Sequence, residues 1–438
     1  MDLLKDNVGK LYRKFFIASF GSALIACIYG LVDMAMVGQY HGPDGSAAMA
    51  VIAPIWNIIY SFGLLCGIGG SVIYAVARGE RDDVKAANGY FTSAFILGTL
   101  WALILWVLVW VCEEPLLRLF GANDALMPLC KEYMVAPKLT VPVYVFINLL
   151  SSFLRNDGDP GRATKAVIFG GIFNVFGDYF FVFTLDMGIK GAGIATAMGA
   201  SMSVLVMLTH FISKKNTLKF VKPLRILNSF KMISVNGFSS FIVDVAMGIA
   251  TMLFNRRVME YLGTDALAVY GVIVVVGTLV QCCSYGIGQA AQPVISRNFG
   301  AGLTDRIKTM LKYNIITAAV FGAIWTVLSM AMPQVFIKLF MTPTPEVLSI
   351  APRIIRIYAI SFILLPFNIY STYYFQAIMR AKISLIASVA RGIVISGALI
   401  LLLPVAFGGN AVWWAMPITE AVVFVYSAVM MKKVKLSR

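Results

Sequence analysis

The sequence has few charged residues. Asp, Glu, Lys and Arg make up only 13% of its 438 residues, whereas 59% are hydrophobic. Soluble globular domains carry about 25% charged residues, so this composition excludes an ordinary soluble protein. The mean hydropathy of +0.83 instead indicates a chain that crosses a membrane many times, with the lipid bilayer as its main surroundings.

Histidine and cysteine are also scarce. The chain has two His and six Cys, and no CxxC motif stands near a histidine as a zinc site would require. The cysteines are therefore expected to act as small apolar side chains. Neither an enzymatic activity nor a cofactor is expected, and the enzyme alternative is weighed below.

Acidic residues are outnumbered by basic ones, 21 to 36, which gives a formal net charge of +15. Such an excess can indicate nucleic-acid binding, but here its distribution explains it differently. Lys and Arg concentrate in the segments that lie on the same side as the N-terminus. By the positive-inside rule, both termini are expected in the cytoplasm and the protein in the plasma (cytoplasmic) membrane, without a nucleic-acid partner.

Twelve apolar runs are each long enough to cross a hydrocarbon core of about 30 Å as a helix. They lie near residues 15–38, 47–77, 90–112, 133–154, 164–185, 189–213, 232–256, 266–290, 313–337, 353–378, 383–407 and 411–431. The predicted fold class is therefore an all-α integral membrane protein with twelve transmembrane helices.

The chain repeats itself. Residues 67–85, GIGGSVIYAVARGERDDVK, resemble residues 286–308, GIGQAAQPVISRNFGAGLTDRIK. The predicted domains are a first six-helix bundle at 1–213, a basic cytoplasmic linker at 214–231 and a second six-helix bundle at 232–438. Six spans per half place both copies in the same orientation, an architecture that transporters use with the binding site between the halves.

The polar residues of Ile172–Thr196 stand out from their apolar surroundings. Asn174 and Asp178 are one helical turn apart and so share a face, and a carboxylate in hydrocarbon costs about 2.5–3.5 kcal/mol. Counting the helical rise from the outer boundary places Asp33, Asp178 and Thr196 about 8–10 Å deep and Asn174 about 16 Å deep. Four oxygen-bearing side chains from three helices thus share a layer.

Two chemistries fit these four residues. Their oxygen atoms could bind a hard cation such as sodium, or the two carboxylates could hold a proton, because like charges at close range do not both stay ionised. Either use would couple an ion to transport. A purely structural role, in which the acids hydrogen-bond neighbouring helices, is the alternative.

Several short motifs then point to a family. LVDMAMVGQY at 31–40, LRNDGDP at 154–160, NVFGD at 174–178, KGAGIAT at 190–196 and GQAAQPVISRNFGAG at 288–302 together resemble the multidrug and toxic compound extrusion (MATE) transporters. These belong to the wider multidrug/oligosaccharidyl-lipid/polysaccharide exporter superfamily. The resemblance covers essentially the whole chain.

The resemblance implies two six-helix bundles arranged as a V around a central cavity. It implies an antiporter that exports organic cations by alternating access, in exchange for inward sodium or protons. Carried to this sequence, the family's cation-coupling site comprises Asp33, Asn174, Asp178 and Thr196, which would also bind sodium if that is the coupling ion. We expect a monomer.

The second half lacks counterparts of these acids, but has charged residues of its own at middle depth: Asp244, Arg391 and Glu420. Buried charges in membranes are generally paired, so Arg391 could bridge Asp244 or Glu420. Alternatively, one of the acids could be a counter-ion for a cationic substrate. The sequence leaves both possibilities open.

Three other functions remain possible. A flippase for lipid-linked oligosaccharides or lipids should have a cavity rich in Arg and Lys, whereas only Arg391 lies well inside a predicted span, away from its ends. An exporter of a narrow metabolite is also compatible with the pattern. A membrane enzyme is disfavoured, because Asp157 and Asp159 have no second acidic motif with which to share a metal.

Overall fold

The structure, a computed structural model, describes residues 2–81, 84–223, 225–341 and 343–436. Within these ranges every element of regular secondary structure is a helix, and there is no strand. In lipid this follows from the apolar runs themselves, because a helix satisfies all its backbone hydrogen bonds internally. The prediction of an all-α fold is confirmed.

The described residues of the first half form seven α-helices, of which α3 and α4 are short. They are α1 (Val8–Arg81), α2 (Val84–Val111), α3 (Glu113–Leu119), α4 (Met127–Tyr133), α5 (Val135–Asn156), α6 (Pro160–Asp178) with its π-helical continuation η1 (Tyr179–Thr184), and α7 (Gly188–Leu208).

The second half repeats this order with more interruptions. Its helices are α8 (Ile226–Gly300), α9 (Thr304–Ala331), α10 (Pro333–Phe340), α11 (Pro345–Ala359), η2 (Ile360–Ile363), α12 (Leu365–Ala377), α13 (Ala381–Val389), η3 (Ala390–Val394), α14 (Ile395–Phe407), η4 (Gly409–Trp414) and α15 (Ala415–Lys433).

The two longest helices each contain two membrane spans. Helix α1 reverses at Gly42, with φ of 64°, and α8 reverses at Gly263, with φ of 80°. Both positions need glycine because positive φ is unfavourable for other residues. Among the described residues, eleven helices are apolar and long enough to span a membrane. One of them is the 75-residue α8, which divides at Gly263, so the predicted twelve spans are present.

Helix boundaries differ from the sequence prediction mainly near the termini of the two halves. The first span begins at Val8 rather than at residue 15, and α8 begins at Ile226. The connection between α7 and α8 therefore occupies residues 209–225 and overlaps only the first part of the predicted linker at 214–231. The reason is that residues 226–231, although polar in part, continue directly into the helix that follows.

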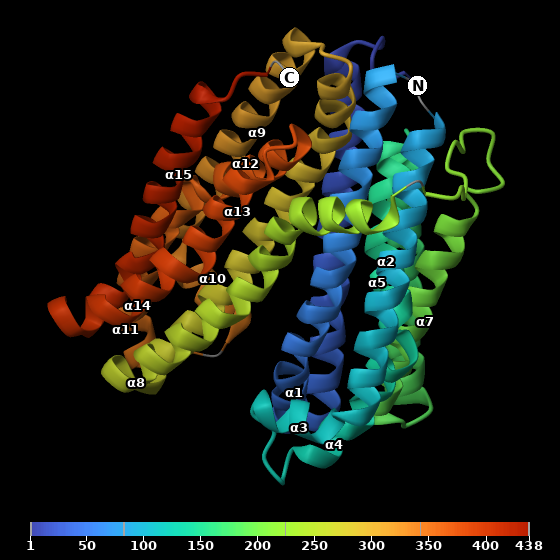
Figure 1. Cartoon of the computed structure of the whole chain (residues 1–438). Helices are drawn as coiled ribbons and strands as arrows, with labels where there is room; N and C mark the ends of the chain where they lie inside the picture. The colour runs from blue at the N-terminus through green and yellow to red at the C-terminus, as the bar shows by residue number, and fades with distance from the viewer. Residues whose placement is uncertain (1, 82–83, 224, 342, 437–438) are drawn as a thin grey trace.

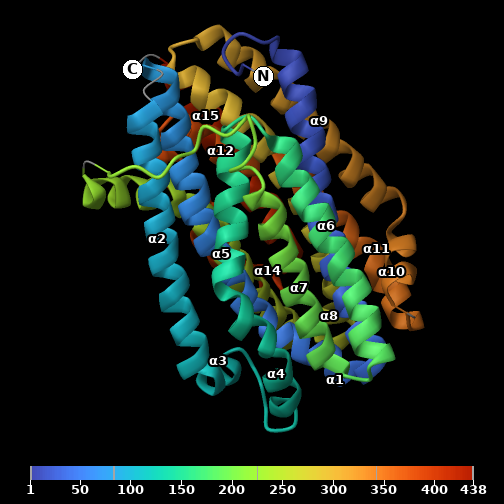
Figure 2. The ribbon, with the colours of Figure 1, turned by 90° about the vertical axis from the view of Figure 1, so that its right-hand side faces the viewer.

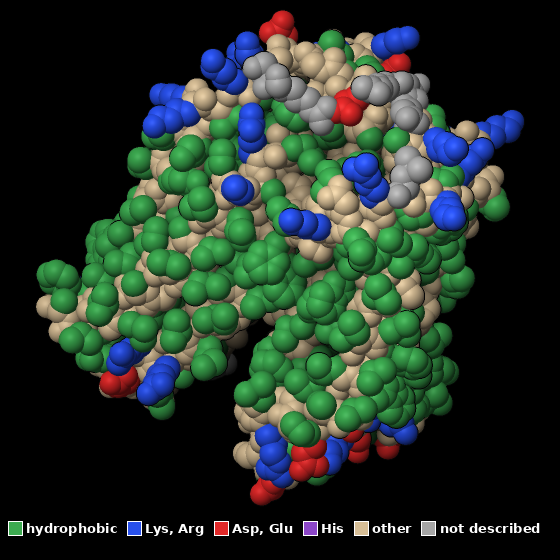
Figure 3. Space-filling view, viewed as in Figure 1, with side chains coloured by type: hydrophobic (Ala, Val, Ile, Leu, Met, Phe, Trp, Pro, Cys, Tyr) green, Lys and Arg blue, Asp and Glu red, His purple; other side chains and the backbone are tan. Residues whose placement is uncertain are grey.

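The two bundles form a V (Figure 1). Both termini lie at the end where the bundles meet, whereas α3 and α4 lie at the opposite end (Figure 2). Figure 3 shows a cleft between the two lobes at that opposite end and a broad hydrophobic band around the middle. Lys and Arg side chains gather above this band, at the end of the termini.

Glycines bring α1 and α8 into backbone contact where the bundles meet. A Cβ atom at Gly79 would overlap the carbonyl oxygen of Arg297, and one at Gly300 would overlap that of Val76. Close approach of this kind is how small residues join helices in membranes. Because Val72 and Val76 belong to the same buried cluster as Ile295 and Phe299, one hydrophobic core continues across the two bundles at this end.

Candidate functional site

The four polar residues of the first bundle come from three helices and are all buried. Asp33 lies in the first span of α1, Asn174 and Asp178 in the last turns of α6, and Thr196 in α7. Asp178 is completely buried and Asp33 is 7% exposed. The four side chains, predicted from the sequence to lie at similar depth, are thus all enclosed by the protein.

Small residues explain why α6 and α7 approach closely enough to bring Asn174 and Thr196 together. A Cβ atom at Gly199 would lie 2.6 Å from the carbonyl oxygen of Gly170, and one at Gly177 would lie 2.9 Å from Cβ of Ala195. These glycines leave no room for a side chain between the helices. The polar residues beside them therefore face each other across the contact.

Hydrogen bonds connect part of this group. Asn174 Nδ2 donates to Thr196 Oγ1 at 3.4 Å, and the hydroxyl of Thr196 also interacts with Asp33. Tyr133, the last residue of α4, donates from its hydroxyl to Asp33 Oδ2 at 3.1 Å. Asp178 makes no such hydrogen bond, but it lies close enough to Asp33 for the two charges to interact.

Several oxygen atoms of the group have no hydrogen-bond partner among the described residues. They are Asp33 Oδ1, Asn174 Oδ1 and both carboxylate oxygens of Asp178. Leaving a buried polar atom unpaired costs about 1–3 kcal/mol, and more if it is charged. The four atoms are all acceptors, so a group that satisfies them must donate a hydrogen bond or carry positive charge, and the chemistry of the oxygen set is compatible with sodium as well as with protonation.

Aromatic residues around the group were not predicted from the sequence. Besides Tyr133, Tyr29 lies within electrostatic range of Asp33, and Tyr144 within range of both acids. Tyr133 stands at the predicted start of the fourth span, where an interfacial position would have been the ordinary interpretation. Only the packing of α4 against the bundle turns its hydroxyl toward Asp33.

The charged residues of the second bundle are also connected. Arg391 Nε donates to Glu420 Oε1 at 2.7 Å, and Asn368 Nδ2 donates to Glu420 Oε2 at 2.6 Å. Asp244 is not part of this pair. It accepts from the hydroxyl of Tyr285 at 2.6 Å, and that hydroxyl accepts from Gln281 Nε2 at 2.6 Å.

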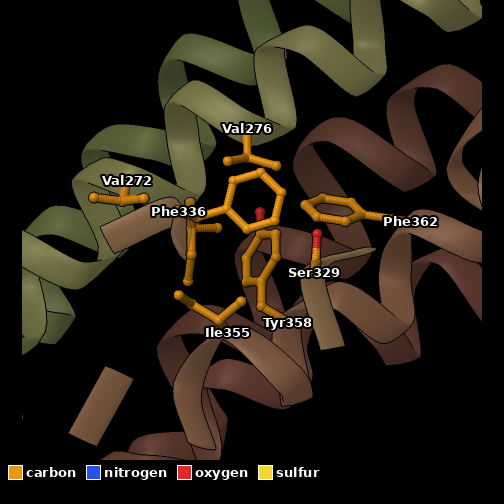
Figure 4. A pocket seen from close by; sticks show the side chains of 8 residues that line it. Val272, Val276, Ser329, Phe336, Ile355, Tyr358 and Phe362 are labelled. Carbon is orange, nitrogen blue, oxygen red and sulfur yellow. The ribbon is translucent and has the colours of Figure 1, made fainter. Parts of the chain in front are cut away.

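Two cavities lie within the second bundle. The larger, of about 80 Å³, reaches Arg391 and Gln281 and is lined by α8, η3 and α14 among other elements. The smaller, of about 10 Å³, is mostly apolar, and the hydroxyl of Ser329 points into it beside Tyr358 and Phe362 (Figure 4). The smaller cavity has room for about one water molecule, so only the larger is a candidate for binding part of a substrate.

Asp157 and Asp159, the acids considered for an enzyme, bind protein groups instead. Asp157 Oδ2 lies 2.8 Å from His210 Nε2 and accepts from the backbone N–H of Thr217 at 2.9 Å. Asp159 pairs with Arg162 at 3.1 Å. Burial alone would raise the pKa of Asp159, but Lys215, Arg162 and His210 outweigh it and hold the pKa below its usual value. Both acids thus fasten the 209–225 connection to the first bundle.

Comparisons with known proteins agree with this architecture. The sequence pattern of the family MatE matches residues 18–180 and again residues 236–401, so each bundle contains one copy. The chain is 24% identical over 427 residues to the multidrug export protein MepA of Staphylococcus haemolyticus strain JCSC1435, covering 95% of this chain and 92% of that protein. It is 23% identical to MepA of Staphylococcus saprophyticus over 426 residues, with the same coverage.

Solved structures show the same fold. One, described as the outward-facing conformation of a multidrug resistance MATE family transporter of the MOP superfamily, superposes with a TM-score of 0.89 at 22% identity, over 98% of this chain and 97% of the other. Another, a MATE protein in complex with MaL6, gives a TM-score of 0.87 at 22% identity, over 98% of both chains. With its family pattern matched in both halves, the chain belongs to the MatE family of membrane transporters.

Proposed function

We propose that this transporter is a secondary active multidrug exporter, which moves organic cations out of the cell in exchange for sodium or protons. Its relatives are named multidrug export proteins, which supports the substrate class. The observation that carries the coupling is the set of buried, unpartnered acceptor oxygens on Asp33, Asn174 and Asp178. Such a set is costly unless a cation or proton occupies it for part of the cycle.

The coupling follows from charge. With Asp33 and Asp178 both ionised, two negative charges lie close together in a region of low dielectric constant, which favours binding of any positive charge. Entry of sodium or protons neutralises the acids and changes which bundle arrangement is favoured. The ion and the substrate then affect each other's binding reciprocally, as linkage requires.

The proposed orientation has both termini in the cytoplasm of a cell whose plasma membrane holds the protein as a monomer. In this orientation the cleft of Figure 3 opens to the outside, which is the state that would release substrate and admit the coupling ion. The glycine contacts between α1 and α8 would close the cytoplasmic side. Rocking of the bundles would then expose the substrate path alternately.

A flippase for lipid-linked oligosaccharides or lipids is the second candidate, and an exporter of a narrow metabolite the third. A pyrophosphate-linked cargo calls for several cationic side chains in the path. Among the residues that line the larger cavity, Arg391 is the only charged one, and Glu420 already neutralises it. This favours cationic or neutral cargo.

The proposal is tested with purified protein in liposomes, where ethidium transport is followed under a sodium gradient and, separately, a proton gradient. We expect one gradient to drive transport and Asp33→Asn and Asp178→Asn each to abolish that driven component. Asp305→Asn is the matched control, because Asp305 is 95% exposed at its side chain and distant from the site.

Absence of ethidium transport under either gradient, with folded protein, would contradict the multidrug proposal and favour the flippase or narrow-metabolite candidates. If gradient-driven transport continues in both variants, the protein is still an exporter, but Asp33 and Asp178 do not take part in ion coupling.

A further inference from the structure

The larger cavity of the second bundle is separate from the cation-coupling group of the first. Its walls come from both spans of α8, from η3 and α14, and from the start of α12. Four polar side chains line it, Thr251, Gln281, Arg391 and Ser396, together with the rings of Phe254, Tyr270, Tyr358 and Phe362. A few polar side chains within a largely apolar and aromatic lining are the usual composition of a small-molecule site.

We propose that this cavity is a carboxylate-binding subsite, in which Arg391 receives the carboxylate of an amphipathic zwitterionic substrate. The inference rests on the proposed export function and extends it to a class of substrate that carries a negative as well as a positive charge. In the polar group of the first bundle the donors already have partners, and the atoms without a partner are all acceptor oxygens. The anionic end of such a compound therefore needs donors elsewhere.

The pairing of Arg391 leaves donors available. Its hydrogen bond to Glu420 uses Nε alone, at 2.7 Å, and its terminal amino groups make no hydrogen bond to other described residues. The other oxygen of Glu420 is occupied by Asn368. Arg–carboxylate pairs are frequently bidentate, but here Glu420 accepts from Nε alone. Because Arg391 lines the cavity, its terminal amino groups remain available as donors to a ligand there.

Ser396 supplies a second, independent indication. Its hydroxyl is buried, the residue being 1% exposed, and has no partner among the described residues. It lines the same cavity as Arg391. A buried hydroxyl without a partner costs about 1–3 kcal/mol, and a carboxylate bound to the guanidinium would accept from it. A planar guanidinium and a hydroxyl are suitable donors for the two oxygens of a carboxylate.

The backbone around Arg391 has an irregularity that is common at functional sites. Arg391 lies in the π-helical turn η3, within the fifth span of the second bundle, and the fifth span of the first bundle carries the π-helical turn η1 directly after Asp178. Single π-helical turns occur frequently at functional sites. At equivalent places in the repeat, the first bundle therefore has the acceptor oxygens of Asp178 and the second bundle has the guanidinium of Arg391.

The remaining walls favour an organic zwitterion over a small inorganic anion. Met247 and Met416 line the cavity together with the aromatic rings, and thioethers and rings pack well against the apolar body of a varied set of ligands. Because Glu420 cancels the net charge of Arg391, a free anion gains little long-range attraction. A zwitterion does not depend on such attraction.

Rhodamine 110, a zwitterion with a free carboxylate, and its methyl ester rhodamine 123, a cation, form a matched pair of probes. Their dissociation constants for the full-length purified protein are measured by fluorescence anisotropy, and their transport in liposomes under the driving gradient. We expect Arg391→Gln to weaken rhodamine 110 binding by about tenfold or more, as loss of charged hydrogen bonds implies, and to change rhodamine 123 binding less than twofold. Ser396→Ala should weaken rhodamine 110 alone, by a smaller factor.

Loss of Arg391 leaves Glu420 buried without its partner, so the single variant can fail to fold. The double variant Arg391→Gln with Glu420→Gln removes both charges and should keep the fold, rhodamine 123 transport and the defect for rhodamine 110. Equal changes for both dyes, or none for rhodamine 110, would overturn the subsite. Binding of a fatty acid to the wild type, without any binding of rhodamine 110, would also overturn the proposal. The carboxylate that the cavity accepts would then come from lipid and not from a zwitterionic substrate.

The two proposals fail in distinguishable ways. If the wild-type protein transports rhodamine 123 but not rhodamine 110, the export function is supported and the carboxylate subsite is contradicted. Wild-type protein that transports neither dye contradicts the export function and this subsite together.

Discussion

At the scale of single residues, Tyr133 does most to define the surroundings of the candidate ion site. Its hydroxyl donates to Asp33 Oδ2, whereas Asp33 Oδ1 and Asp178 have no protein partner among the described residues. The hydrogen bond stabilises the ionised form of Asp33. Tyr133 therefore opposes protonation of Asp33 and competes with a cation for Oδ2, while it leaves Oδ1 available to the ion.

Tyr133→Phe should consequently strengthen ion binding. The hydrogen bond to a charged acceptor is worth about 1.5–3 kcal/mol, so we expect the half-saturating concentration of the coupling ion to fall by about tenfold. Turnover should fall as ion release slows. The measurement is ethidium transport against ion concentration, with the exposed Tyr179→Phe as control. A higher or unchanged half-saturating concentration would exclude this role for Tyr133.

At the scale of helices, the contact between α1 and α8 holds the bundles together on one side only. Gly79 and Gly300 place backbone against backbone there, whereas the opposite ends of the bundles diverge (Figure 1). At these two glycines the helices touch through backbone atoms, while the buried side chains around them continue the hydrophobic core across the two bundles. The same device joins α6 to α7 through Gly170 and Gly199, but inside one bundle, where it positions the ion site.

Gly79→Ala should destabilise the closed side. The added Cβ would overlap the carbonyl oxygen of Arg297 and lie 2.9 Å from the backbone nitrogen of Ala301, and overpacking of this kind costs about 1–3 kcal/mol. We expect the population to shift toward an arrangement open at the end of the termini and narrower at the cleft. The control is Gly271→Ala, because a Cβ at Gly271 meets nothing within 4 Å.

The shift is measured by electron paramagnetic resonance between spin labels at the exposed Asp124 and Phe407, with the native cysteines replaced. A new population at shorter distance should appear for Gly79→Ala and not for Gly271→Ala. Identical distance distributions in both variants and the parent would show that this glycine contact does not set the equilibrium.

At the scale of the whole molecule, charge is distributed along the axis of the V. Lys and Arg cover the end that carries the termini, and hydrophobic side chains cover the middle (Figure 3). Positively charged segments are retained in the cytoplasm when a membrane protein is inserted. The orientation is therefore a property of the complete charge distribution and not of any single loop.

Topology can be checked with single cysteines in a cysteine-free background. Asp124→Cys, at the cleft end, should react with a membrane-impermeant maleimide on intact cells, whereas Lys214→Cys, in the 209–225 connection, should react only after permeabilisation. Both positions are exposed, so accessibility reports the side of the membrane. The reverse pattern would place the termini outside and turn the cleft toward the cytoplasm.

The sequence by itself determined the all-helical class, the twelve spans and the repeat. It could do so because a run of about 20 apolar residues has almost no alternative to a helix in lipid, and because Asn174 and Asp178, one turn apart, must share a face. Counting the helical rise also predicted that Asp33 and Thr196 lie near them, and the structure brings the four residues together. These properties depend on residues close together in the chain, so they can be predicted from the order of residues alone.

Only the tertiary structure decided which side chains meet. The sequence allowed Arg391 to pair with either Asp244 or Glu420. In the structure, η3 packs against α15 and Arg391 pairs with Glu420. Asp244 instead accepts a hydrogen bond from Tyr285. The contact of Tyr133 with Asp33 and the unpartnered oxygens around it were equally invisible. The physical reason is that depth along a helix follows from residue number, whereas rotation about its axis is fixed by long-range packing against the other helices.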